Sequence, residues 1–98
     1  MTIDFSQDNG NLSIKLEGRL DSTTSGDLEQ FLENKITSST ISLCLNFAKV
    51  DYISSKGLRI LVSTFKKMNG RPMTIINANA SVMEIMRLSG LLKVFNVS

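Results

Sequence analysis

The stretch Val50–Leu61, VDYISSKGLRIL, organises the rest of this chain. A hydrophobic strand is predicted to end just before it, and an amphipathic helix is predicted to begin inside it. Ser54 suits the N-cap of that helix, because a serine hydroxyl there accepts a hydrogen bond from a first-turn amide. Ser55 would then open the first turn. Free amides and the positive helix end favour an anion. The two serines therefore either only cap the helix or also offer a place for a phosphate.

An antiparallel hairpin is predicted at the N-terminus. Ile3 and Phe5 alternate with polar residues, as in a half-buried strand. Asn9-Gly10 favours a tight turn, because both residues tolerate positive φ angles. The segment 12–17 alternates again and is the predicted return strand.

Strand and helix patterns then alternate along the chain. Helical spacing of apolar residues predicts helices over 28–36, 58–68 and 82–89, the second with a core-facing stripe of Leu58, Leu61, Val62, Phe65 and Met68. Strands are predicted over 41–48, 73–76 and, at the end, over Val94, Phe95 and Val97.

The strand over 41–48 has one apolar face and one face of small residues, which predicts coverage on both faces. We expect an α/β fold in one domain, residues 1–98. Its mixed β-sheet has about five strands, with an N-terminal antiparallel hairpin and three helices packed mainly on one side.

Composition excludes several classes of function. The net charge of +2 gives no argument for nucleic-acid binding, and no cluster of basic residues stands out. Histidine is absent and the single cysteine, Cys44, is expected to be a buried, inert thiol. We therefore predict no metal site and no cofactor. The N-terminus has no apolar signal core, and no apolar run approaches the roughly 18 residues of a membrane helix, so the chain is expected to be soluble and cytoplasmic.

The serine stretch resembles the signature loop of STAS domains, in particular of bacterial anti-sigma factor antagonists. In the members that phosphorylation switches, the modified serine lies two positions before the glycine. The glycine here is Gly57, so the resemblance implies phosphorylation of Ser55. Ser54 stands where several members have aspartate, and Lys56 departs from the usual Ala, Ser or Thr.

Two further segments resemble the same family. Gly18–Asp21, GRLD, matches a turn that leads into the first helix, and Leu88–Leu91, LSGL, recurs near the end of such domains. Asp21 is the matching acid. Its position is equally typical of an acid that only stabilises a helix N-terminus.

The resemblance implies a binding module. The unphosphorylated form would bind an anti-sigma factor that is also a serine protein kinase, and so release the sigma factor. Phosphorylation would abolish binding, and a serine phosphatase would restore it. The implied partner-binding residues are Asp21, Ser54, Ser55, Lys56, Gly57, Leu58 and Arg59.

Two alternatives stand beside this hypothesis. STAS domains also serve as constitutive accessory subunits of phospholipid-transport ABC complexes. An enzyme is not expected, because a nucleophilic serine needs a base within reach, and histidine, a G-x-S-x-G motif and a Walker A loop are all missing.

At Gly57, an added side chain should crowd either the loop itself or an approaching partner, and we expect a Gly57→Leu protein to fold but bind poorly.

Overall fold

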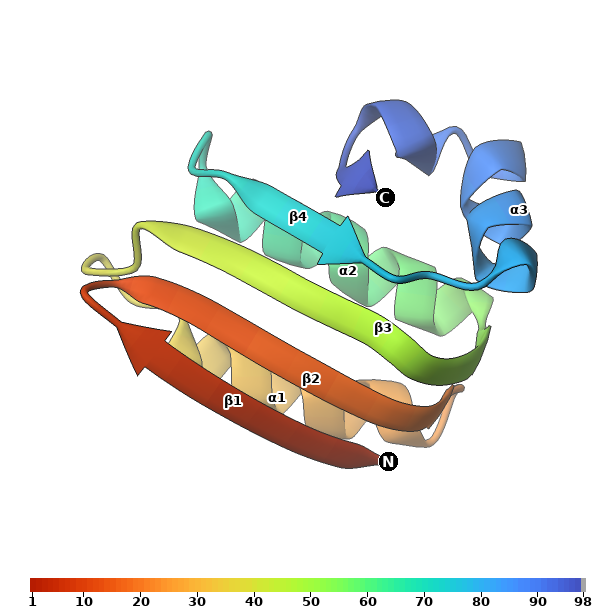
Figure 1. Ribbon diagram of the computed structural model, residues 1–98, viewed down its shortest axis with the longest axis horizontal. Coiled ribbons are helices and arrows are strands. Elements are labelled where there is room, and N and C mark those ends of the chain that lie inside the picture. The colour runs from red at the N-terminus through yellow and green to blue at the C-terminus, as the bar shows by residue number, and fades with distance from the viewer. Residues whose placement is uncertain (98) are drawn as a thin grey trace.

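The computed structural model describes residues 1–97 and contains a five-stranded sheet in the order β1-β2-β3-β4-β5 (Figure 1). β1 (Thr2–Asp8) pairs antiparallel with β2 (Asn11–Leu20). β3 (Ser42–Ile53), β4 (Met73–Ile76) and β5 (Asn96–Val97) continue the sheet in parallel. The predicted mixed sheet with its N-terminal hairpin is confirmed.

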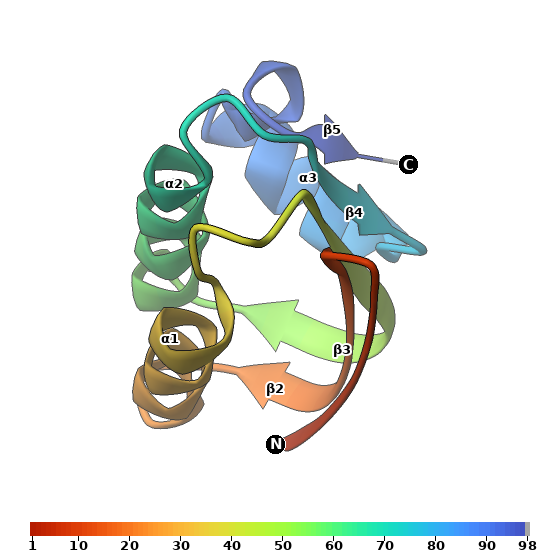
Figure 2. The ribbon, with the colours of Figure 1, turned by 90° about the vertical axis from the view of Figure 1, so that its left-hand side faces the viewer.

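Two of the helices form a layer on one face of the sheet. Figure 2 shows α1 (Thr24–Lys35) and α2 (Ser55–Met68) side by side on that face. α3 (Ala80–Leu88) lies beyond the carboxyl ends of β3 and β4, and the short 3-10 helix η1 (Leu91–Lys93) follows it (Figure 1). The expected packing of the helices mainly on one side is confirmed.

The core fills the space between the sheet and the two-helix layer. The residues of β2 and β3 that face it are almost completely buried, namely Leu12, Ile14, Leu16, Leu20, Leu43, Leu45, Phe47, Val50 and Ile53. They alternate with more exposed residues along the first part of each strand, and the spacing widens where the register between the strands shifts. Each fully buried aliphatic side chain contributes about 1.5–3 kcal/mol. The long alternating strands therefore fix which way the sheet faces.

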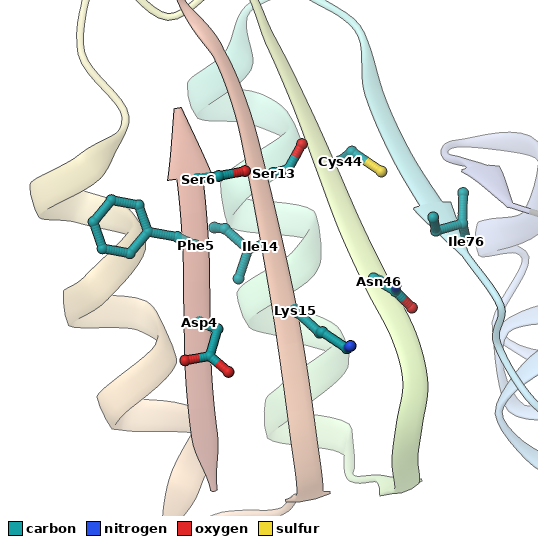
Figure 3. Close-up of a pocket in the computed structure, with 9 residues that line it drawn as sticks. All are labelled: Asp4, Phe5, Ser6, Ser13, Ile14, Lys15, Cys44, Asn46 and Ile76. Atoms are coloured by element: carbon teal, nitrogen blue, oxygen red, sulfur yellow. The ribbon is translucent and has the colours of Figure 1, made fainter. Parts of the chain in front are cut away.

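The prediction that the central strand is covered on both faces is wrong for the described residues 1–97. Ser42, Cys44 and Asn46 lie half-buried on the face away from α1 and α2. Figure 3 shows this face from outside, where Cys44 and Asn46 line a shallow hollow of about 420 Å³ together with Ser13 and Lys15. Partial burial raises the pKa of the Cys44 thiol, which keeps it protonated and unreactive at neutral pH.

The buried face of α2 also differs from its predicted stripe. Leu61 and Met68 are buried as expected, but Gly57, Ile60 and Thr64 complete the buried face. Thr64 can be buried because its hydroxyl donates to the carbonyl of Ile60 at 2.8 Å. The helix is thus rotated relative to the prediction, and Leu58, Val62 and Phe65 are only half-buried at its side.

Several element boundaries also differ from the prediction. β3 does not end before Val50 but continues through Ile53, directly to the serine pair. The last strand comprises only Asn96–Val97, and Val94 is 39% exposed. Within residues 1–97, no helix combines the length and the apolar character that a membrane crossing requires.

Arg71 joins the end of α2 to the loop that precedes β3. Its guanidinium donates to the carbonyls of Met68 and Lys67 at 2.7 and 3.1 Å, and to those of Thr37 and Thr40 at 2.8 and 2.6 Å. Charge-assisted bonds of this kind are stronger than neutral ones. They anchor the far end of α2 and so help to fix the position of its N-terminus.

Candidate functional site

The serine pair lies where two parallel strands end side by side. Leu20, the last residue of β2, is the register partner of Ile53, the last residue of β3. The amide of Ser54 donates to the carbonyl of Leu20 at 2.9 Å, which extends the ladder by one bond. Both helices of the layer therefore start at one edge of the sheet, and this edge brings Asp21 and the segment 54–58 together.

Ser54 is the N-cap of α2, as predicted. Its backbone is extended, with φ −92° and ψ 171°, and its hydroxyl accepts from the amide of Gly57 at 3.1 Å. Ser55 is the first helical residue and its side chain is exposed. The two adjacent serines thus have different roles: one is engaged by the backbone and the other faces solvent.

Gly57 lies against the strand ends rather than at the surface. A Cβ atom there would lie 2.9 Å from Cγ of Leu20, 3.0 Å from Cγ1 of Ile53 and 3.1 Å from the carbonyl oxygen of Leu20. From the sequence alone, a side chain at this position could crowd either the loop or a partner. The structure shows that it would crowd the loop. The expectation that the Gly57→Leu protein folds normally is therefore replaced by the expectation that it is destabilised.

Asp21 caps α1. One carboxylate oxygen accepts from the amides of Thr23 and Thr24 at 2.9 and 3.0 Å, and from the Thr24 hydroxyl at 3.2 Å. The backbone bonds from Thr24 and Thr23 are the main reason that the pKa of Asp21 lies below its usual 3.8, with Arg19 adding a weaker attraction at 3.9 Å. Asp21 therefore has a structural role at this edge, whatever else it contacts.

This pKa shift predicts how stability depends on acid. A carboxyl whose pKa is lower in the folded state stabilises the fold above its unfolded pKa, and that contribution is lost as pH falls through the folded pKa. We expect Asp21→Asn to be less stable than the wild type at pH 6. The difference should begin to shrink near pH 3.8 and disappear as pH falls through the lower pKa of the folded state. Urea denaturation across pH 2–7 measures this. A difference that does not change with pH would contradict it.

The remaining predicted site residues lie on the first turns of α2. Lys56 is exposed, and its ammonium group donates to the carbonyl of Ser22 at 3.3 Å, so it bridges the starts of the two helices. Leu58 is half-buried against the core, and Arg59 is exposed one turn after Ser55.

A groove of about 610 Å³ runs along α2 from Ser55. The α2 side chains that line it are Ser55, Leu58, Arg59, Val62, Ser63 and Lys66. Ser89 and Leu91, from the segment after α3, form its other wall. Five of the lining residues are not among the predicted site residues, namely Val62, Ser63, Lys66, Ser89 and Leu91. The LSGL motif contains Ser89 and Leu91, but only the fold places them beside Ser55.

Ser55 presents an exposed hydroxyl at the start of α2. Within residues 1–97, neither serine side chain is hydrogen-bonded to a carboxylate or an amine that could act as a base. Ser55 and Lys56 amides open α2 and make no hydrogen bond to the described residues, so they remain available to an anion.

Comparisons with known proteins agree with this architecture. A family model described as the STAS domain matches residues 2–98. The chain is 26% identical over 100 residues to BtrV, a candidate anti-sigma factor antagonist of Bordetella bronchiseptica, with 100% of this chain and 86% of BtrV covered.

Solved structures show the same fold. An anti-sigma factor antagonist from Mycobacterium paratuberculosis matches with a TM-score of 0.88 at 24% identity, covering 98% of this chain and 83% of that one. The unphosphorylated form of the anti-sigma factor antagonist SpoIIAA matches with a TM-score of 0.84 at 15% identity, covering 99% of this chain and 88% of that one.

Proposed function

The chain belongs to the STAS domain family, and from this membership we propose that it is an anti-sigma factor antagonist regulated by phosphorylation of Ser55. In this proposal the unphosphorylated protein binds an anti-sigma factor that is also a serine kinase. Binding releases the sigma factor. A serine phosphatase reverses the modification, and the exchange takes place in the cytoplasm.

One observation supports Ser55 over Ser54 as the phosphate acceptor. The hydroxyl of Ser54 is engaged with the amide of Gly57, whereas Ser55 is exposed on the same turn. A kinase must reach the hydroxyl, and it could reach Ser55 without breaking the cap. The geometry and the spacing to Gly57 in the resembling family thus favour the same residue.

The physical basis of the switch is local. A phosphoserine carries about −1.5 to −2 charges at pH 7. The free amides at the start of α2 would stabilise that charge, so the fold should survive. A partner surface that packs against a neutral serine would instead have to bury the charge without a counterpart, which is costly. Phosphorylation would therefore act on the complex and not on the fold.

The partner surface in this proposal is the edge where the two helices begin, comprising Asp21, Ser54, Ser55, Lys56, Gly57, Leu58 and Arg59. The members of this set differ in kind. Gly57 and Asp21 support the surface from within, by close packing and by capping, whereas Ser55, Lys56 and Arg59 are exposed and could contact a partner directly. We propose no catalytic activity for the chain itself.

Phosphosite mapping tests this proposal. The purified protein is incubated with ATP and the serine kinases of the anti-sigma type that its own genome encodes. Mass spectrometry should then place one phosphate on Ser55, and Ser55→Ala should receive none. If none of these kinases modifies the protein, the constitutive accessory role becomes the better hypothesis.

Ser54→Ala is the matched variant. Removing this cap should lower the free energy of unfolding by about 1 kcal/mol, measured by urea denaturation, yet the phosphate on Ser55 should still be found. A phosphate on Ser54 in the wild type would show that our choice of residue is wrong.

A further inference from the structure

Apolar side chains that would normally belong to a core line the groove beside Ser55. Leu58 and Val62 from α2 and Leu91 from η1 are all only half-buried there. Nearby, Leu88 at the end of α3 is 72% exposed, more than any other large apolar residue among those described. The groove thus offers apolar surface next to the proposed switch residue.

The charges of α2 show which chemistry this surface would accept. The helix carries the cations Lys56, Arg59, Lys66 and Lys67 and no acidic residue. Lys56 and Lys67 donate to the carbonyls of Ser22 and Glu33, at 3.3 and 3.0 Å. The side chains of Arg59 and Lys66, which line the groove, form no hydrogen bond or ion pair within the described residues 1–97.

We propose that this groove binds an acidic, amphipathic segment of a partner protein, with two carboxylates opposite Arg59 and Lys66 and apolar side chains between them. Residues 59 and 66 are two helical turns apart, about 10 Å along the axis. Acids seven positions apart on a partner helix have the same spacing. Apolar side chains at the intervening three- and four-residue positions would meet Leu58, Val62 and Leu91.

The position of Ser55 at one end of the groove connects this surface to regulation. Arg59 is one turn further along the helix, so a phosphate on Ser55 would compete for its guanidinium. It would also repel the acidic segment directly. This step rests on the proposed function, because it takes the groove's occupant to be part of the partner that phosphorylation releases.

Titration with a defined peptide tests the groove without any kinase. The probe is a capped 14-residue helical peptide with two glutamates seven residues apart and two leucines between them. NMR spectra of the nitrogen-15-labelled protein should show changes in the amide chemical shifts of Leu58, Val62, Lys66 and Leu91 when the peptide is added. The amide of Lys15, on the open face of the sheet, should not change. The same peptide with glutamines in place of its glutamates should bind about five-fold more weakly at low salt.

Matched variants distinguish binding in the groove from a general effect of the protein's net charge. Arg59→Gln with Lys66→Gln should weaken binding by a similar factor. Lys15→Gln with Lys67→Gln removes the same net charge outside the groove and should leave binding unchanged. Shifts elsewhere on the protein, equal binding of the glutamine peptide, or tighter binding of an oligothymidylate would overturn the proposal.

Ser55→Asp isolates the regulatory step. The substitution should weaken binding of the glutamate peptide more than that of the glutamine peptide, and equal effects on both would overturn the electrostatic link. No kinase is involved in these titrations, so they test peptide binding to the groove by itself. Failure of the proposed function would instead show as an unmodified Ser55 in the phosphosite experiment.

Discussion

Gly57→Leu should lower the free energy of unfolding by about 3 kcal/mol or more. The Cβ alone would stand 2.9 Å from Cγ of Leu20 and 3.1 Å from its carbonyl oxygen. The carbonyl is held by the amide of Ser54, and the side chain of Leu20 is completely buried in the core. The leucine would have to separate α2 from the ends of β2 and β3. For a domain of this size, the melting temperature should fall by more than about 12 °C.

Gly26 provides the matched control, since it also lies near the start of a helix. A Cβ at Gly26 meets no atom within 4 Å. Gly26→Ala should therefore stabilise the protein by up to about 1 kcal/mol, because alanine favours the helix. Gly57→Ala should destabilise it despite the same gain in propensity. Calorimetric scans of the three variants decide the matter, and a melting temperature of Gly57→Leu near that of the wild type would contradict the close packing.

Local signals made much of this fold predictable. The Asn-Gly turn with alternating residues on both sides is sufficient to predict the hairpin of β1 and β2. The serine at the start of an amphipathic stretch likewise predicts the N-cap at Ser54, because capping involves only neighbouring residues. These features depend on short-range chemistry, and the structure confirms them.

Features that depend on distant contacts were harder to predict. The rotation of α2 could not be read from its apolar residues, since a glycine and a threonine occupy its buried face. Small residues on β3 indicated a second covered face, yet the same residues also suit an open face with a shallow hollow. The groove brings Lys66 and Leu91 together from different elements, and only the tertiary fold determines that meeting.

Ser55→Asp should weaken binding to the partner kinase by about 30-fold or more, because leaving a charge buried and unpaired in an interface costs at least about 2 kcal/mol. The protein itself should remain as stable as the wild type. An acidic residue at the first position of α2 interacts favourably with the helix dipole, by about 0.3–1 kcal/mol. Calorimetric titration of the complex and thermal unfolding of the free variant measure the two effects separately.

Ser39→Asp adds the same charge in an exposed position of the loop before β3, at the opposite end of that strand from Ser55. It should bind the kinase as the wild type does, whereas Ser55→Ala should bind it with or without ATP. The three variants together separate charge from position. Equal weakening by Asp at residues 39 and 55 would indicate a general electrostatic effect, and undiminished binding of Ser55→Asp would place the interface elsewhere on the protein. If phosphorylation acts on the complex and not on the fold, only Ser55→Asp should lose binding, and its melting temperature should stay near that of the wild type. The reason is that the start of α2 tolerates the added charge, whereas the partner surface does not.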